Sequence, residues 1–252
     1  METLSVTIIT QAEEDNIRAS LESVSFADEI IVVDSGSTDR TREICLEYTD
    51  KVHHRDWNGY ASQKNAAGDM ASGDWILNLD ADERVTGELA AEIQQALASP
   101  GPGIAGYYLN YKVLFWGKWL SHGGFYPEKH LRLYRREQGS FPQRTVHEAL
   151  EVRGRTAELK GHIEHYTYKG IEDFISRMQQ YSTLSAREYA RQGRSTGVVR
   201  MSARAIFTFI KMYILRRGFL DGYKGYVVAV LYSVYTFTKY AKLKELEDKT
   251  AP

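Results

Sequence analysis

Cysteine is almost absent from this chain, since Cys45 is the single one among 252 residues. This excludes an intramolecular disulfide framework and any metal site built from several cysteines, and it suits a reducing compartment. Long apolar runs are absent as well. The longest extends from Tyr226 to Thr238, shorter than the roughly 18 residues that a membrane-spanning helix needs. The first apolar run, Val6 to Ile9, is too short for the core of an export signal. We therefore expect a cytoplasmic location.

A large net charge is also missing, because 32 lysines and arginines nearly balance 33 aspartates and glutamates. This balance argues against a protein that mainly coats nucleic acid, so we expect no nucleic-acid partner. A hydrophobic content of 43% with 26% charged residues excludes intrinsic disorder. What the chain does have is aromatic side chains, with 17 tyrosines, nine phenylalanines and four tryptophans.

The first third of the chain alternates short β-branched runs with helical patterns. Strands are expected at residues 4–9, 29–33, 51–53 and 75–79, and helices at 14–23, from Ser37 or Thr38 to Tyr48, and at 59–71. Thr86 is expected to cap a further helix that reaches Leu97. Repeated strand–helix units of this length predict an α/β fold, with a mostly parallel sheet flanked by helices on both faces.

The rest of the chain differs in pattern. Residues 104–168 are aromatic, punctuated by glycine and strand-like, whereas the pattern after Gly170 is helical. We expect a catalytic domain over residues 1–168, made of a first half (1–98) and a second half (104–168), followed by a helical extension over residues 169–252.

Acidic residues follow three of the expected strands. They lie in Thr10-Gln11-Ala12-Glu13, in Asp34-Ser35-Gly36-Ser37-Thr38-Asp39 and in Asp80-Ala81-Asp82-Glu83. Ligands of parallel α/β sheets bind at the carboxyl ends of the strands. Each segment alone could form a turn or a helix cap. Together, however, such carboxylates repel one another, so their convergence indicates a cation, Mg²⁺ or Mn²⁺.

Glycine-rich phosphate-binding loops are missing from the sequence, both the G-x-x-x-x-G-K-[ST] form and a G-x-G-x-x-G after the first strand. If the sheet binds a nucleotide, metal and side chains must neutralise its diphosphate. Lys64 and Asn65, on the helix before the fourth strand, are candidates for this role. The alternative for Lys64 is a solvated helix face.

Four ordered segments, IITQAEEDNI, IIVVDSGSTDRT, QKNAA and WILNLDADE, resemble those of family 2 inverting glycosyltransferases with the GT-A fold. The later segments GGFYPEKHLRLYRR, VHEAL and HYTY resemble a narrower subgroup, the bacterial lipopolysaccharide core glucosyltransferases that add β-1,4-glucose to heptose. The resemblance implies transfer of glucose from a UDP-sugar to a lipid-linked saccharide acceptor, the inner-core heptose. Residues 1–98 would then bind nucleotide sugar and metal, and residues 104–168 the acceptor.

The resemblance also assigns nucleotide-binding roles. Thr10 and Glu13 match the segment that contacts base and ribose, and Asp34 matches the acid that binds uracil. The chain departs from the family at Ser35, where a second aspartate is usual, and at Thr10 and Ala12, where proline and asparagine are common.

The metal and the diphosphate are assigned in the same way. Asp80 matches the acid that holds the ribose or a metal-bound water, and Asp82 matches the metal ligand. Lys64 occupies the position of a basic residue near the diphosphate.

The implied reaction is a direct displacement at the anomeric carbon, which requires a general base for the acceptor hydroxyl. The resemblance makes Glu148 our first choice, because it lies about as far beyond Asp82 as the base of the family usually does, and Glu128 is the second. His147 or His165 could complete the metal shell, although a structural role is the more common one for such histidines. One of Arg132, Arg135 and Arg136 could contact a phosphate, because residues of a strand alternate between its faces.

Residues 199–244 contain nine basic residues, ten phenylalanines and tyrosines, and Asp221 as the single acid. Cationic, aromatic and amphipathic character together predict an interfacial helix on the cytoplasmic face of the inner membrane. The alternative is a helical hairpin that packs on the catalytic domain or mediates a dimer. Two other functions remain open, a glycosyltransferase that charges polyprenyl phosphate and a catalytically silent nucleotide-sugar-binding scaffold.

Overall fold

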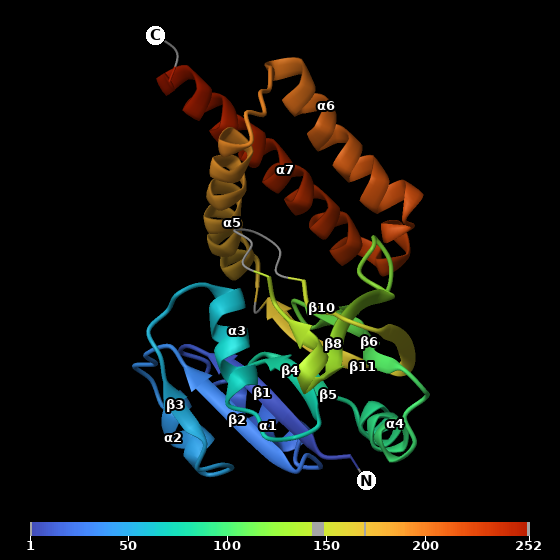
Figure 1. Ribbon diagram of the computed structural model, residues 1–252. Coiled ribbons are helices and arrows are strands. Elements are labelled where there is room, and N and C mark those ends of the chain that lie inside the picture. Colours follow the sequence, from blue (N-terminus) through green and yellow to red (C-terminus); the bar gives the residue numbers. More distant parts are fainter. Residues whose placement is uncertain (1, 143–148, 169, 251–252) are drawn as a thin grey trace. The chain divides into compact units, whose positions relative to one another are not determined.

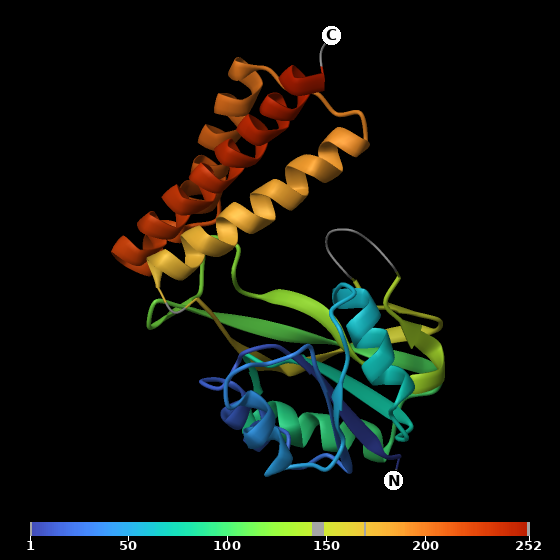
Figure 2. The same cartoon turned by 90° about the vertical axis from the view of Figure 1, so that its left-hand side faces the viewer.

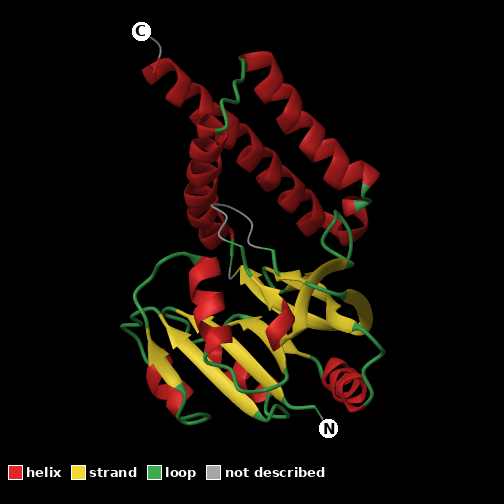
Figure 3. Cartoon of the chain, viewed as in Figure 1, coloured by secondary structure: helices red, strands yellow, loops and turns green. Residues whose placement is uncertain are grey.

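The computed structural model describes residues 2–142, 149–168 and 170–250. They form two compact units. The sheet unit comprises Met1–Tyr111 and Glu128–Tyr166, and the helical unit comprises Lys112–Pro127 and Thr167–Pro252. Figure 3 distinguishes the mixed helices and strands of the first from the long helices of the second. The domain limits expected from the sequence stay a prediction.

Four parallel strands begin the sheet, β1 (Leu4–Thr10), β2 (Glu29–Asp34), β3 (Val52–His54) and β4 (Trp75–Asp80). They are the strands that the sequence predicts, in the order β3-β2-β1-β4 (Figure 1). Because they are parallel, Thr10, Asp34 and Asp80 all lie at their carboxyl ends.

The remaining strands are largely antiparallel. The sheet continues from β4 as β8-β6-β11-β5, and β7 pairs with β6. Their bounds are β5 Glu83–Val85, β6 Ile104–Phe115, β7 Lys118–Leu120, β8 Glu128–Arg135 and β11 Arg155–Tyr168. A separate two-stranded sheet joins β9 (Gly139–Ser140) to β10 (Glu151–Val152), and a 3₁₀ turn, η1, covers Arg136–Gln138.

Helices cover both faces of the sheet, as the strand–helix pattern predicts. On one face, α1 (Ile17–Ser23), α2 (Thr41–Leu46) and α4 (Gly87–Ala98) pack on Val6, Ile8 and Leu77. On the other, α3 (Tyr60–Asp69) packs on Ile31, Val33 and Ile76. The neighbours Ile76 and Leu77 therefore fill different cores.

Of the two helix caps expected from the sequence, one is confirmed and one is wrong. Thr86 caps α4, since its hydroxyl oxygen accepts from the Leu89 amide at 3.3 Å. The cap expected at Ser37 or Thr38 is wrong, because α2 begins at Thr41, whose amide donates to Asp39 at 3.0 Å. The Ser37 hydroxyl donates to Asp34 instead and so belongs to the loop that follows β2.

The helical unit contains α5 (Ile171–Arg191), α6 (Val198–Phe209) and α7 (Gly222–Thr250). Between α6 and α7 lie a π-helical segment, η2 (Ile210–Leu215), and a 3₁₀ turn, η3 (Gly218–Asp221). Figures 1 and 2 show α7 between α5 and α6. Across the described ranges, we find no helix with both the length and the apolarity needed to cross a membrane.

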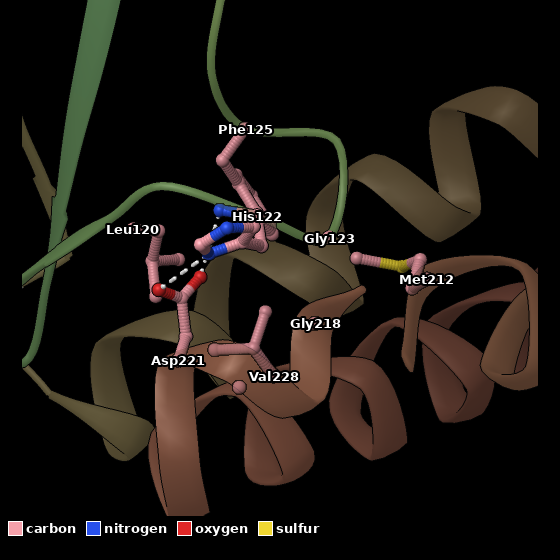
Figure 4. A pocket seen from close by; sticks show the side chains of 9 residues that line it. Leu120, His122, Gly123, Phe125, Met212, Gly218, Asp221 and Val228 are labelled. Carbon is pink, nitrogen blue, oxygen red and sulfur yellow. Dashed lines mark hydrogen bonds and ion pairs between the residues drawn. The ribbon is translucent and has the colours of Figure 1, made fainter. Parts of the chain in front are cut away.

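The buried Asp221 joins the segment Ser121–Phe125 to these helices (Figure 4). Its carboxylate accepts from the backbone amides of Ser121 at 3.2 Å and His122 at 2.8 Å, and it lies 3.3 Å from the His122 ring. The Gly123 amide also donates to the Arg216 carbonyl at 2.8 Å. The cavity among these residues is about 10 Å³, space for about one water, so the contact is a packed joint.

Candidate active site

Asp80, the last residue of β4, lies between two cations. Its Oδ1 atom is 2.8 Å from the ammonium nitrogen of Lys64 on α3, and its Oδ2 atom is 3.0 Å from the guanidinium of Arg132 on β8. The Lys64 side chain is only 6% exposed, so the solvated position considered from the sequence is wrong. The carboxylate of Asp80 is therefore neutralised within the protein.

Strand register brings Arg132 to this position. In the antiparallel pair of β4 and β8, Leu77 faces Leu133 and Ile76 faces Tyr134. Arg132 directly precedes Leu133 in β8, and its guanidinium also donates to Asn78 Oδ1 at 2.9 Å. Of the three neighbouring arginines, Arg132 is thus the one that enters the charged cluster.

Arg135 and Arg136 have other partners. Arg135 pairs with Glu2 at 2.9 Å and lies over the Trp75 ring, whereas Arg136 donates to the Gly73 carbonyl at 3.0 Å. Both stabilise the amino-terminal side of β4, at the opposite end from Asp80.

The charges fix the ionisation of Asp80. Burial alone raises the pKa of a carboxyl group, but the positive charges of Lys64 and Arg132 outweigh it and hold the pKa of Asp80 well below its usual range. Asp80 is therefore an anion at any physiological pH, available as an acceptor of hydrogen bonds.

Glu83, fully buried at the start of β5, is a member of the cluster that the sequence analysis did not select. It accepts hydrogen bonds from the Asp80 amide at 2.9 Å, the Tyr111 hydroxyl at 3.2 Å and Arg132 at 3.3 Å. Burial raises its pKa, and Arg132 opposes that shift. Glu83 thus fixes the turn between Asp80 and Asp82. Its place directly after the D-x-D triplet was the available signal.

Asp82 and His165 form a second pair at this turn, with 3.3 Å between Oδ2 and Nε2. His165 reaches the turn because β11 runs antiparallel to β5 and places it opposite Glu83. Burial would lower the pKa of His165, but Asp82 outweighs burial and raises the pKa to about 9. The His165 ring is therefore an imidazolium at neutral pH.

The donor set of this pair fits a divalent cation. A carboxylate oxygen and an imidazole nitrogen are both metal ligands, and Mg²⁺ usually takes one or two protein carboxylates together with substrate phosphates. Among the described residues, no three His, Cys, Asp or Glu side chains group closely enough to hold a metal by themselves. Asp82 and His165 would consequently hold an ion with the help of a bound diphosphate.

Thr10 and Asp34 lie side by side at the ends of β1 and β2. The buried Thr10 hydroxyl oxygen has no hydrogen-bond partner within the described residues. Asp34 accepts from the amides of Gly36 and Ser37, both at 3.2 Å, so the turn-forming role considered from the sequence is confirmed. Glu13 accepts from Asn16 at 2.7 Å. Base and ribose binding by Thr10, Glu13 and Asp34 stays a prediction.

Three further predicted residues have different surroundings. Asn65 uses its amide to bond both backbone groups of Phe141, at 2.7 and 2.8 Å, so it positions that segment beside Lys64. Glu128 is exposed and lies 3.3 Å from His130. Glu148 falls outside the described residues, as does His147. The contact of Asn65 with the nucleotide stays a prediction, and so does the choice between Glu148 and Glu128 as the general base.

A cavity of about 180 Å³ opens beside Arg132. Its lining residues come from β6, β8 and the segments next to β9 and β10, and include Tyr108, Lys129, His130 and Phe141. Since Arg132 contributes to both, the cavity adjoins the cluster around Asp80.

The model of "Glycosyl transferase family 2" matches residues 5–153. An uncharacterized glycosyltransferase of Rickettsia typhi is 32% identical over 99% of this chain and 89% of its own length. The lipopolysaccharide core biosynthesis glycosyltransferase LpsC of Rhizobium meliloti is 28% identical over 95% of this chain and 91% of its own.

Among solved structures, a mannosyltransferase from Pyrobaculum calidifontis in complex with GDP-Man and Mn²⁺ is similar in fold. The TM-score is 0.58 at 16% identity, and the match covers 98% of this chain and 88% of that one. The expected GT-A fold with a helical C-terminal stretch is confirmed.

Proposed function

Because this chain belongs to glycosyl transferase family 2, we propose that it transfers a hexose from a UDP-sugar to a saccharide of the lipopolysaccharide core, with inversion at the anomeric carbon. Glucose is the proposed sugar and an inner-core heptose the proposed acceptor. The observation that carries the proposal is the convergence of Asp80, held between Lys64 and Arg132, with the pair Asp82–His165 at one edge of the sheet.

Asp82 and His165 would hold Mg²⁺ or Mn²⁺. The bound cation supplies charge stabilisation for the diphosphate leaving group. For His165 to act as a ligand, the ring nitrogen that binds the metal must lose its proton. Binding of the ion therefore competes with protonation of the ring, which the raised pKa of His165 favours.

Lys64 and Arg132 keep Asp80 ionised and fixed in direction. An oriented carboxylate is suited to accept hydrogen bonds from ribose hydroxyls, which would place the anomeric carbon at a constant distance from the metal ligands. The Thr10 hydroxyl, which has no partner among the described residues, and the loop shaped by Asp34 support a place for the nucleobase at the ends of β1 and β2.

A carboxylate on the acceptor side would take the proton of the incoming hydroxyl. Glu148 is the proposed base, with Glu128 as the alternative. Glu148→Gln should abolish transfer and leave donor binding intact, whereas Glu128→Gln should remain active. The reverse result would move the assignment to Glu128.

The relative LpsC, whose name assigns it to lipopolysaccharide core biosynthesis, supports this choice of acceptor. We place the enzyme at the cytoplasmic face of the inner membrane, in contact with the lipid surface that carries the acceptor. The cavity beside Arg132 is the proposed entry for the acceptor sugar.

A donor screen tests the proposal. UDP-glucose, UDP-galactose, UDP-N-acetylglucosamine and GDP-mannose would each be incubated with the protein, Mn²⁺ and extracted truncated lipopolysaccharide, and release of nucleoside diphosphate measured. We expect acceptor-dependent release from a UDP-sugar that stops on chelation of the metal. Replacing the lipopolysaccharide by polyprenyl phosphate tests the alternative acceptor.

The matched variants are Asp82→Asn and Asp50→Asn, the second removing an exposed acid from the turn before β3. Asp82→Asn should lower turnover by on the order of 10²–10³-fold, and Asp50→Asn should leave it unchanged. Donor binding without turnover on any acceptor would instead support the silent scaffold.

A further inference from the structure

The outer side of α6 carries an apolar stripe that no helix among the described residues covers. Val199, Ala203, Ile206 and Ile210 recur at helical spacing, and the exposed fractions of Val199 and Ile206 are 84% and 60%. The opposite side of α6 is the packed one, where Met201 is buried against α7. Figures 1 and 2 show that α7 is the neighbour of α6 within the helical unit.

The stripe continues past α6 through η2 and η3. Ile214, Leu215, Phe219 and Leu220 are all exposed, Leu215 to 65%. These side chains are exposed and so contribute to no hydrophobic core of the described residues. An exposed apolar patch of this extent marks an interaction surface.

Exposed cations border the stripe. Arg200 and Lys211 lie on α6 and η2, about 100° around the helix from Val199 and Ile210, and Arg216 and Arg217 follow before η3. From residue 189 to residue 244, Asp221 is the single acid, and its carboxylate is buried in the joint with Ser121 and His122. The surface therefore presents apolar and positive groups together.

The basic residues of the second half of α7 are occupied differently. Lys242 donates to Ser182 and Thr183 of α5, both at 2.8 Å, and Lys244 pairs with Asp248 at 2.7 Å. Lys239 lies over the rings of Tyr189 and Tyr240. Lys239 and Lys242 connect α7 to α5, and Lys244 pairs within α7, so the exposed cations that border the stripe lie in residues 198–223.

We propose that this α6 face, residues 198–223, docks on a lipid bilayer rich in anionic head groups, with Ile206, Phe207 and Leu215 inserted below them. A bilayer matches both components, because its interior accepts the apolar stripe and its anionic head groups attract the bordering cations. A second copy of this chain matches poorly, since a two-fold contact would oppose arginines to arginines with no exposed acid between them.

The proposal rests on the proposed function only for its purpose, which is to hold the enzyme at a membrane-borne acceptor. The binding itself is independent of transfer, so the two can fail separately. Vesicle binding without any transfer would support docking by the α6 face and contradict the proposed reaction.

Sedimentation of the full chain with vesicles tests the proposal. Vesicles of phosphatidylcholine with 30% phosphatidylglycerol, about the content needed for a clear negative surface, would be compared with pure phosphatidylcholine. We expect strong binding to the first and weak binding to the second. Equal binding to both, or no binding to either, would overturn the proposal.

Variants identify the face. Arg200→Gln with Lys211→Gln should weaken binding to anionic vesicles by about 30-fold, at about tenfold per 1.4 kcal/mol and about 1 kcal/mol per cation. Arg42→Gln with Lys160→Gln removes the same charge from exposed positions of the sheet unit and should have no effect. Phe207→Ser should weaken binding without a change of charge.

Circular dichroism would confirm that each variant is folded, and transfer to a delipidated core saccharide would confirm that the active site is intact. Equal binding by the α6 variants and the sheet-unit variants would reject the face. A dimer in solution that Phe207→Ser dissociates would also reject the bilayer and assign the stripe to a second copy.

Discussion

The ammonium group of Lys64 lies 2.8 Å from the carboxylate of Asp80, and this pair connects the middle of α3 to the end of β4. Lys64 is almost fully buried, so its charge has no access to bulk water and acts on Asp80 and on whatever binds next to it. We propose that a bound diphosphate contacts this positive charge, which is already in position.

Lys64→Met should remove this charge while keeping much of the side-chain volume. Since a preorganised cation is worth more than one recruited from solvent, we expect kcat/KM to fall by about 10²-fold. Steady-state turnover with the UDP-sugar found active would measure it. Lys160→Met, at an exposed position, is the control, and a Lys64→Met enzyme as active as this control would contradict the role.

Removal of His165 tests the metal pair. In His165→Ala, Mn²⁺ affinity in the presence of UDP should fall by about 10–100-fold, the range found when residues around a metal are altered. Electron paramagnetic resonance of free Mn²⁺ gives the affinity. His53→Ala removes an exposed imidazole from β3 and should change nothing. Unaltered Mn²⁺ binding by His165→Ala would show that His165 is not a ligand of the metal.

Acid should destabilise the sheet unit through Glu29. Burial of this carboxylate opposes its ionisation, but hydrogen bonds from Lys51, Ser5 and Ser72 outweigh burial and lower its pKa to about 2. A carboxyl group with a lowered folded-state pKa stabilises the fold above its unfolded pKa, and that stability is lost as the pH falls toward 2.

Between pH 6 and pH 3 the wild type should thus lose about 1–2 kcal/mol of unfolding free energy through Glu29. In Glu29→Gln this part of the pH dependence should vanish. Urea denaturation at both pH values measures the difference, and parallel losses in the two proteins would show that Glu29 is not the source.

The cap of α4 offers a local test of stability. Thr86→Ala removes the acceptor of the Leu89 amide and should cost about 1 kcal/mol, whereas Thr86→Ser keeps the oxygen and should cost less. Thermal unfolding followed by circular dichroism compares the two. Equal losses would mean that the methyl group, not the hydroxyl, is what matters at Thr86.

Asp221 should control the order of the segment after β7. Asp221→Ala removes the acceptor of the Ser121 and His122 amides, so hydrogen exchange at these two amides should quicken. Leaving buried donors unsatisfied costs about 1–3 kcal/mol. Exchange at the core amides of β1 serves as the internal reference, and unchanged protection of His122 would show that the joint does not depend on the carboxylate.

Much of the parallel half of the fold could be predicted because it depends on local patterns. The runs around Ile8, Val33 and Leu77 are apolar, β-branched and flanked by helical periodicity, so the parallel sheet and the edge with Asp34 and Asp80 follow from general rules.

The antiparallel half could not be predicted in the same detail because its register depends on distant pairings. Strand alternation indicated that only some of the three arginines face the cleft, but the pairing of Leu77 with Leu133 decided that it is Arg132. Likewise, the joint between the segment around Gly123 and Asp221 depends on helices about 100 residues away.

The register of β8 has a consequence for the order of folding. Arg132 is separated from Asp80 by 52 residues, so the carboxylates of Asp80 and Glu83 are close together in the chain long before their shared cation can arrive. Non-local pairings of this kind form slowly. We therefore expect the mutual repulsion of these acids to persist in the folding chain until β8 pairs with β4 and brings Arg132 to them.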